Sequence, residues 1–304
     1  MLRTAILYLS HRKGFQHLIM NLGLSRRLAL RFVAGESLDN AIAAVAALNR
    51  EGARATLDHL GENVNDPEAA ARAAAAVMTA LSRIAASGVD SNVSIKLTQM
   101  GLELSEDLCL ANVRQVLETA RRHGNFVRLD MEGSDCTERT LALYHRLREL
   151  GYDNVGVAIQ SYLYRSQADV EKLLAQGARV RLVKGAYNEP PSLAYPHKRD
   201  VDDNFLRLAE PLLQHGNYPA IATHDERIIA WTERFAAQHG IGHERFEFQM
   251  LYGIRRDLQR RLAREGYNVR VYVPYGDEWY GYLMRRLAER PANLLFFLVS
   301  FLRG

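Results

Sequence analysis

The chain has 304 residues, of which 48% are hydrophobic and 24% charged, and its formal net charge is +4. These values fit a globular protein with a substantial core, and the arginine pairs behind the positive charge alternate with acids, so we expect no nucleic-acid partner. Neither Cys109 nor Cys136 belongs to a CxxC or Cys/His motif, which excludes a disulfide scaffold and a structural zinc site. We expect no bound metal.

The first 50 residues predict two helices. Helical periodicity covers about 14–34 and about 37–50, and the second segment is rich in alanine. A segment of this size is too short to enclose a hydrophobic core of its own. We therefore expect residues 1–50 to form a helical arm that packs on a single larger domain, residues 51–304.

From residue 52 onward, short β-branched and apolar runs alternate with longer stretches of helical periodicity. The runs that predict strands are Ala53–Leu57, Val93–Leu97, Phe126–Met131, Val155–Ile159, Val180–Val183, Ala220–Ala222, Phe246–Phe248 and Val269–Val273. Strands that are apolar on both faces and joined by helices form a parallel sheet buried on both sides. Eight such units match a closed (β/α)8 barrel. The alternative, an open doubly wound sheet, would need a glycine-rich nucleotide loop after an early strand, and the sequence has none.

Polar residues lie in or directly after almost every predicted strand. They are Lys96, Asp130, Glu132, Gln160, Arg181, Lys184, Thr223, His224, Asp225, Glu247, Gln249 and Tyr272. The active site of such a barrel lies at the carboxyl ends of the strands. Each residue alone has a structural alternative, for instance as the cap of the following helix. Their recurrence along one rim favours a catalytic or binding site.

The stretch Val180–Tyr187 is the most informative local pattern. Arg181 lies inside the predicted barrel and Lys184 stands at the end of the strand. Gly185 and Ala186 then remove side-chain bulk, which lets a flat or phosphorylated ligand approach the backbone. Two cations beside small residues favour an anionic cofactor. The alternative is a network of lysines and aspartates that only stabilises the barrel.

A second group lies on the last predicted helix. Tyr282, Arg285, Arg286 and Glu289 occupy positions i, i+3, i+4 and i+7, which share one helical face. Such a face can hold a carboxylate through two guanidinium groups. The alternative is an exposed face, because an ordinary barrel helix turns its charged side toward solvent. The group can close the site only if the helix lies over the rim.

Seven stretches together resemble the proline dehydrogenase family, including the dehydrogenase domain of bacterial proline utilisation A. They are VSIKLT (Val93–Thr98), VRLDMEG (Val127–Gly133), VGVAIQSYL (Val155–Leu163), VRLVKGAYNEP (Val180–Pro190), IATHD (Ile221–Asp225), FEFQMLYG (Phe246–Gly253) and VRVYVPYGDEWYGYLMRRLAERPAN (Val269–Asn293). They follow the predicted barrel in order from its second strand to its end. The last stretch is the most specific, and the short chain resembles the monofunctional bacterial form.

The resemblance implies a distorted (β/α)8 TIM barrel whose last helix, about 277–290, lies over the active site. It implies oxidation of L-proline to 1-pyrroline-5-carboxylate, with hydride passing from proline C5 to N5 of a non-covalently bound FAD and electrons passing on to a quinone. The implied location is the cytoplasm, and it includes peripheral contact with the inner face of the bacterial membrane.

The resemblance also assigns roles around the substrate. Arg285 and Arg286 match the pair that holds the substrate carboxylate, and Lys96 matches the lysine that assists them. Glu289 matches an acid that ion-pairs with this cluster. Tyr272 and Tyr282 match the aromatic residues that pack on the proline ring.

Further matches concern catalysis and the cofactor. Asp130 matches the acid that orders the cationic cluster, and it is the nearest candidate for a general base. Arg181 matches the arginine near flavin N5, where a fixed positive charge stabilises the reduced ring. The positions that match FAD contacts are Met131, Gln160, Arg181, Lys184, Gly185, Ala186, Lys198, Thr223, His224 and Gln249.

Two other functions remain open at the level of the residues. A Schiff-base aldolase or lyase on the same barrel would use Lys96 or Lys184 as its nucleophile. A non-catalytic basic module would instead bind nucleic acid or anionic lipid, with steep salt dependence. Bound flavin would exclude both.

Overall fold

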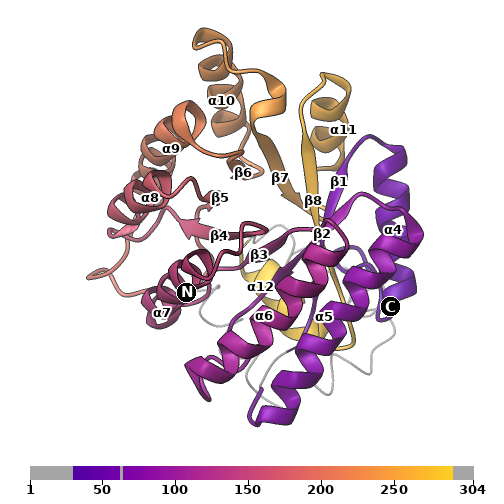
Figure 1. Ribbon diagram of the computed structural model, residues 1–304. Helices are drawn as coiled ribbons and strands as arrows, with labels where there is room; N and C mark the ends of the chain where they lie inside the picture. The colour runs from indigo at the N-terminus through magenta and orange to yellow at the C-terminus, as the bar shows by residue number, and fades with distance from the viewer. Residues whose placement is uncertain (1–29, 62–63, 290–304) are drawn as a thin grey trace, which may run out of the picture.

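The computed structural model describes residues 30–61 and 64–289, and in the last helix it describes side chains as far as Met284. Eight strands form a closed parallel barrel in chain order, with β8 returning to pair with β1 (Figure 1). The strands are β1 (Arg54–His59), β2 (Ser91–Ile95), β3 (Val127–Leu129), β4 (Val155–Gln160), β5 (Arg179–Val183), β6 (Ala220–Ala222), β7 (Glu247–Leu251) and β8 (Val269–Tyr275). The predicted (β/α)8 barrel is confirmed.

Helices alternate with the strands, and all but the last of them surround the barrel (Figure 1). They are α4 (Leu38–Arg50), α5 (Pro67–Ser87), α6 (Glu106–Arg122), α7 (Ser134–Glu149), α8 (Ser166–Ala175), α9 (Lys198–His215), α10 (Glu226–Gln238), α11 (Arg256–Arg264) and α12 (Trp279–Glu289), with a short 3-10 turn at His243–Arg245. Ser37, Asp66 and Ser105 cap the starts of α4, α5 and α6 by accepting a backbone N–H. The strands are buried on both faces, as in β2 and β4, where every residue is buried.

Helix α4 covers the seam of the barrel. It packs against both β8 and β1, the two strands that close the ring, and it turns Ala41, Val45 and Leu48 toward them. This helix matches the predicted segment 37–50. Most of the other predicted segment, 14–34, lies outside the described residues, and its described end, residues 30–33, forms turns and a bend. The division of the chain at residue 50 stays a prediction.

The bounds of β3 and β7 differ from the prediction. Strand β3 ends at Leu129, so Asp130 and Met131 stand beyond it on the rim. Strand β7 runs from Glu247 to Leu251, although only Phe246–Phe248 was predicted. The prediction that Glu247 and Gln249 stand at the end of this strand is therefore wrong. Both are buried within the barrel, where ion pairing and hydrogen bonds make polar side chains tolerable.

Among the described helices, only α5 is long and apolar enough to cross a membrane by length and composition. Its many alanines, together with Val77, Leu81 and Ile84, account for this property. The helix packs against β1, β2, α4 and α6, which is the position of a barrel wall helix.

Candidate active site

A cavity of about 710 Å³ opens at the carboxyl ends of the strands, which is within the usual size range of ligand pockets. Every predicted site residue with a described side chain lines it. These residues are Lys96, Asp130, Met131, Gln160, Arg181, Lys184, Gly185, Ala186, Lys198, Thr223, His224, Gln249, Tyr272 and Tyr282. Residues from seven strands or the loops after them, from α9 and from α12 thus meet in one place.

Asp130 is the centre of the polar cluster in this cavity. Its Oδ1 accepts a hydrogen bond from Arg181 Nη1 at 2.5 Å, and its Oδ2 accepts one from the Tyr272 hydroxyl at 2.7 Å. Burial, followed by the Asp130 carboxylate, raises the pKa of Tyr272 well above its usual value. Tyr272 therefore stays a phenol that donates, and both oxygens of Asp130 are occupied by orienting contacts.

Lys96 is held by an acid that sequence reasoning missed. Asp58, at the end of β1, accepts from Lys96 Nζ with both oxygens at 2.9 Å, and only 1% of its side chain is exposed. Asp130 Oδ2 lies 3.9 Å from the same Nζ. The signal was available, because Asp58 and His59 end the first strand just as the other polar residues end theirs.

The charge of Lys96 is fixed by its surroundings. Burial opposes the charged form, but the carboxylates of Asp58 and Asp130 outweigh it and raise the pKa of Lys96 above its usual range. A Schiff-base nucleophile must be a neutral amine. The arrangement around Lys96 is thus that of a permanent cation, which argues against the lyase alternative for this residue.

Arg181 is almost fully buried, and hydrogen bonds fix the orientation of its guanidinium group. Its Nε donates to Gln249 Oε1 at 2.5 Å and its Nη1 also donates to Ser94 Oγ at 3.1 Å. The remaining Nη2 and the Oε1 of Gln160 are buried, and neither atom has a hydrogen-bond partner among the described residues. A donor and an acceptor of this kind on one cavity wall fit a flat ligand with a polar edge.

Lys184 and Lys198 form a second charged group at another part of the cavity. Lys184 Nζ lies 2.5 Å from Asp202 Oδ1 and 2.8 Å from Asp225 Oδ2. Lys198, the first residue of α9, contacts the same two acids. Burial opposes the charge of Asp225, but its hydrogen bond from Lys184 prevails and lowers the pKa of Asp225 to about 2. The predicted alternative, a lysine–aspartate network, is thus present, and it borders the cavity.

Helix α12 lies over the cavity and not on the outer wall. Tyr282 is buried and lines the cavity together with Lys96 and Tyr272. Since α4 covers the seam of β8 and β1, the outer position of a last barrel helix is already filled. The side chains of Arg285, Arg286 and Glu289 lie outside the described residues, so the predicted carboxylate clamp stays a prediction.

The family model for proline dehydrogenase matches residues 41–297. The chain belongs to the proline dehydrogenase family. It is 49% identical over 281 residues to a proline dehydrogenase of Deinococcus radiodurans, with 91% of each chain covered. It is also 44% identical over 303 residues to proline dehydrogenase 1 of Bacillus subtilis subsp. natto, and the match covers the full length of both.

Among solved structures, this family member resembles proline utilization A from Bdellovibrio bacteriovorus, with a TM-score of 0.80 and 28% identity. The match covers 86% of this chain and 32% of that chain, so the similarity concerns about a third of the longer protein. The family and the barrel predicted from the sequence are both confirmed. The roles of single residues stay predictions.

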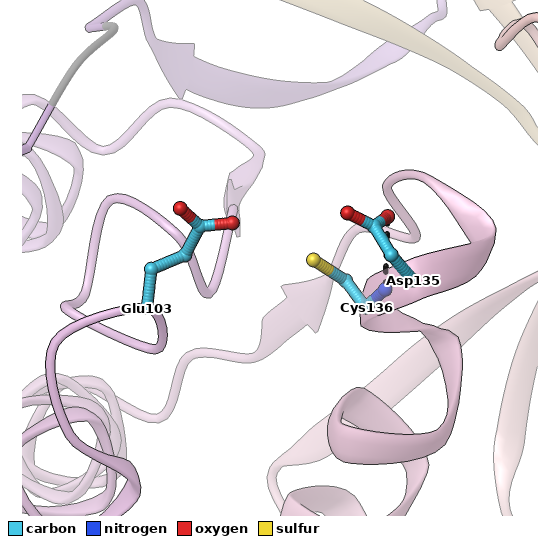
Figure 2. A group of neighbouring side chains, drawn as sticks. All are labelled: Glu103, Asp135 and Cys136. Carbon is cyan, nitrogen blue, oxygen red and sulfur yellow. Dashed lines mark hydrogen bonds between the residues drawn. The ribbon is translucent and has the colours of Figure 1, made fainter.

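One group outside the cavity brings a cysteine close to two acids. The donor atoms of Glu103, Asp135 and Cys136 lie within 4.8 Å of one another (Figure 2). Burial and then Asp135 raise the pKa of the Cys136 thiol to about 11. The thiolate, which is the form that binds metals, is therefore disfavoured. The sequence could not predict that Glu103 and Cys136 are close, because Glu103 lies in a turn before α6 and Cys136 lies on α7.

Proposed function

We propose that this chain is a flavin-dependent dehydrogenase that oxidises L-proline to 1-pyrroline-5-carboxylate. Membership of the proline dehydrogenase family supports the reaction. The observation on which the proposal rests is the cluster of Lys96, Asp58, Asp130, Tyr272 and Arg181 at one cavity wall. It provides a fixed cation for a substrate carboxylate and a second fixed cation for a cofactor, held apart by one shared acid.

The cofactor in this proposal is non-covalent FAD, and the residues present fit it. When bound, FAD supplies the two-electron acceptor for the hydride that leaves proline C5. Arg181 offers a spare buried donor and Gln160 a spare buried acceptor toward the cavity. Lys184, just after β5, and Lys198, the first residue of α9, would hold the phosphate groups. Both contact Asp202 in the first part of α9, and the amino end of a helix favours anions.

The substrate is anchored by its carboxylate in this account. Lys96 provides one permanent charge, and Arg285 and Arg286 provide a bidentate partner from α12. Glu289 would ion-pair with this cluster. Tyr272 and Tyr282 would enclose the proline ring and orient C5 toward the cofactor, since hydride transfer needs a separation of roughly 3–3.5 Å. Asp130 orients the cations, since both of its oxygens already accept hydrogen bonds.

The remaining cavity residues complete the cofactor site. Met131 would pack against the flavin, and Thr223, His224 and Gln249 would contact it from β6 and β7. Gly185 and Ala186 would let it approach the backbone after β5. Electrons would pass to a quinone, and we propose a cytoplasmic enzyme in peripheral contact with the inner face of the membrane. We also propose that residues 1–50 act as an arm on a barrel of residues 51–304.

The test is turnover of L-proline by the purified protein with a soluble quinone, together with identification of the cyclic imine product. We expect proline-dependent quinone reduction and FAD release on acid precipitation. A colourless protein that forms a borohydride-stable adduct with a substrate would establish the lyase alternative instead. Flavin that stays in the acid pellet would contradict non-covalent binding.

A further inference from the structure

Behind Arg181, two residues of β7 form a hydrogen-bonded chain into the barrel. Glu247 and Gln249 lie two positions apart and therefore share a face of the strand. Gln249 accepts from Arg181 Nε at 2.5 Å, and its own Nε2 donates to Glu247 Oε1 at 2.5 Å. Glu247 and Gln249 are 2% and 5% exposed, so the chain is shielded from solvent.

The hydrogen bonds from Arg181 through Gln249 to Glu247 can form in only one sense, because Arg181 and Glu247 differ chemically. A guanidinium only donates hydrogen bonds and a carboxylate only accepts them, whereas a glutamine amide has one side of each kind. With Glu247 at one side, the NH₂ group of Gln249 must face Glu247. Its oxygen must then face Arg181. Without an acceptor at position 247, the NH₂ group loses the contact that holds it, and only the Arg181 N–H is left to select the orientation of the amide.

Arg270 on β8 fixes Glu247 in turn. Its Nε lies 2.9 Å and 3.0 Å from the two oxygens of Glu247, and its Nη1 donates to the carbonyl of Ala55 at 2.8 Å. Burial opposes the charge of Glu247, but Arg270 outweighs it and lowers the pKa of this carboxyl. Glu247 is therefore a carboxylate held in one place.

We propose that Glu247 is a positioning residue, which sets the orientation of the Gln249 amide and through it the orientation of the Arg181 guanidinium beside the cofactor. This inference rests on the proposed function, because it gives Arg181 the task of stabilising reduced flavin. The alternative is that Glu247 and Arg270 form an ion pair that only joins β7 to β8.

The test replaces the ion pair as a unit, with Glu247→Met and Arg270→Met in one protein. Removing both partners leaves the net charge unchanged and leaves neither Glu247 nor Arg270 behind as an unpaired buried charge. We expect the flavin midpoint potential to fall and kcat to drop on the order of tenfold, as for other residues that orient a functional group through a hydrogen bond. KM for proline should stay close to that of the wild type.

The same double variant in an Arg181→Met background should cause no further change in potential. Gln249→Met breaks the series of hydrogen bonds but leaves the ion pair intact, so it tests the link if the double variant does not fold. In the Arg181→Met background it should cause no further change in potential, whereas a direct flavin contact of Gln249 would still shift it. Asp169→Asn is the control, since it breaks a half-buried ion pair with Arg165 at 2.7 Å at the start of α8, away from the cavity. It should lower thermal stability without moving the potential.

An unchanged potential in the folded, flavin-loaded double variant, or in Gln249→Met, would overturn the inference. A further fall in potential on adding the double substitution to Arg181→Met would overturn it as well, since Glu247 would then act independently of Arg181. A wild-type protein without flavin would instead refute the proposed function. The two failures are therefore distinguishable.

Discussion

Asp58 shows how one buried acid can set the chemistry of a site. Its two oxygens hold Lys96 Nζ, and its charge is a main reason why the pKa of Lys96 lies above the usual range in spite of burial. A raised pKa means that the cation is fully present below the ordinary lysine pKa of about 10.4 and is lost only above it. Lys96 therefore stays a cation throughout the physiological range, as its proposed role in carboxylate binding requires.

The first prediction concerns Asp58→Asn. Without this carboxylate, the burial of Lys96 is less opposed and its pKa should fall. KM for proline should then rise with pH at alkaline values where the wild-type KM, corrected for titration of proline itself, is flat. The measurement is the pH profile of KM for both proteins. Parallel profiles would show that Asp58 does not control the charge of Lys96.

The pairing of Lys96 with Asp58 could not be predicted from the sequence. Most residues that line the cavity could be predicted from their positions at strand ends, because the carboxyl ends of parallel strands meet on one rim. Which carboxylate pairs with which cation depends on side-chain direction across the barrel, and Lys96 and Asp58 lie 38 positions apart. Spacing along the chain holds no information on such a pair.

At the scale of elements, α12 is the helix that completes the site. Tyr282 places it over the cavity, and the same helix carries Arg285 and Arg286. Helical periodicity predicted that the two arginines share a face with Tyr282. Periodicity could not tell whether this face meets solvent or substrate, since that depends on α4 filling the outer position.

The second prediction concerns Arg286→Met. Removing one arm of a bidentate carboxylate clamp should lower kcat/KM for proline by roughly 2–5 kcal/mol, mostly through KM, because the remaining charge stays unpaired. Flavin content should not change. Steady-state kinetics and the flavin absorbance of the purified variant provide the measurement. Loss of flavin with normal proline affinity would place α12 at the cofactor instead.

The third prediction concerns the turn after β5. Gly185 has a φ of +110°, and a Cβ atom there would come within 2.4 Å of the Tyr162 ring. Gly185→Ala should therefore shift this turn and weaken flavin binding, measured by titration of the apoprotein with FAD. Gly124→Ala is the control, since Gly124 also has a positive φ of +60° but no atom within 4 Å of its added Cβ. Equal FAD affinity in both variants would contradict the predicted role.

Strand β7 shows why element bounds were harder to predict than element order. Its polar residues Glu247 and Gln249 suggested that the strand ended early. In the barrel they are paired with Arg270 and Arg181, which removes most of the cost of burying them. The pattern of apolar residues predicts that a strand exists, but it underestimates the length of a strand whose polar residues have buried partners.

At the scale of the whole molecule, α4 covers the seam at which the barrel closes. It precedes the first strand, yet it packs against β8 as well as β1 and so ties the start of the barrel to its end.

The fourth prediction is that Leu48→Ala lowers the free energy of unfolding by about 2–5 kcal/mol. Urea unfolding measures it, with the half-exposed Leu150→Ala as control. A loss no larger than that of the control would mean that α4 is dispensable.

The central claim is that proline reduces a flavin bound in the cavity at the carboxyl ends of the strands. The most direct measurement is anaerobic rapid mixing of the purified protein with L-proline that carries either hydrogen or deuterium at C5. We expect the flavin absorbance to bleach, and to bleach several times more slowly with the deuterated substrate, because the C5–H bond breaks in that step. Flavin absorbance that proline leaves unchanged, or a rate that is identical for both substrates, would contradict the account.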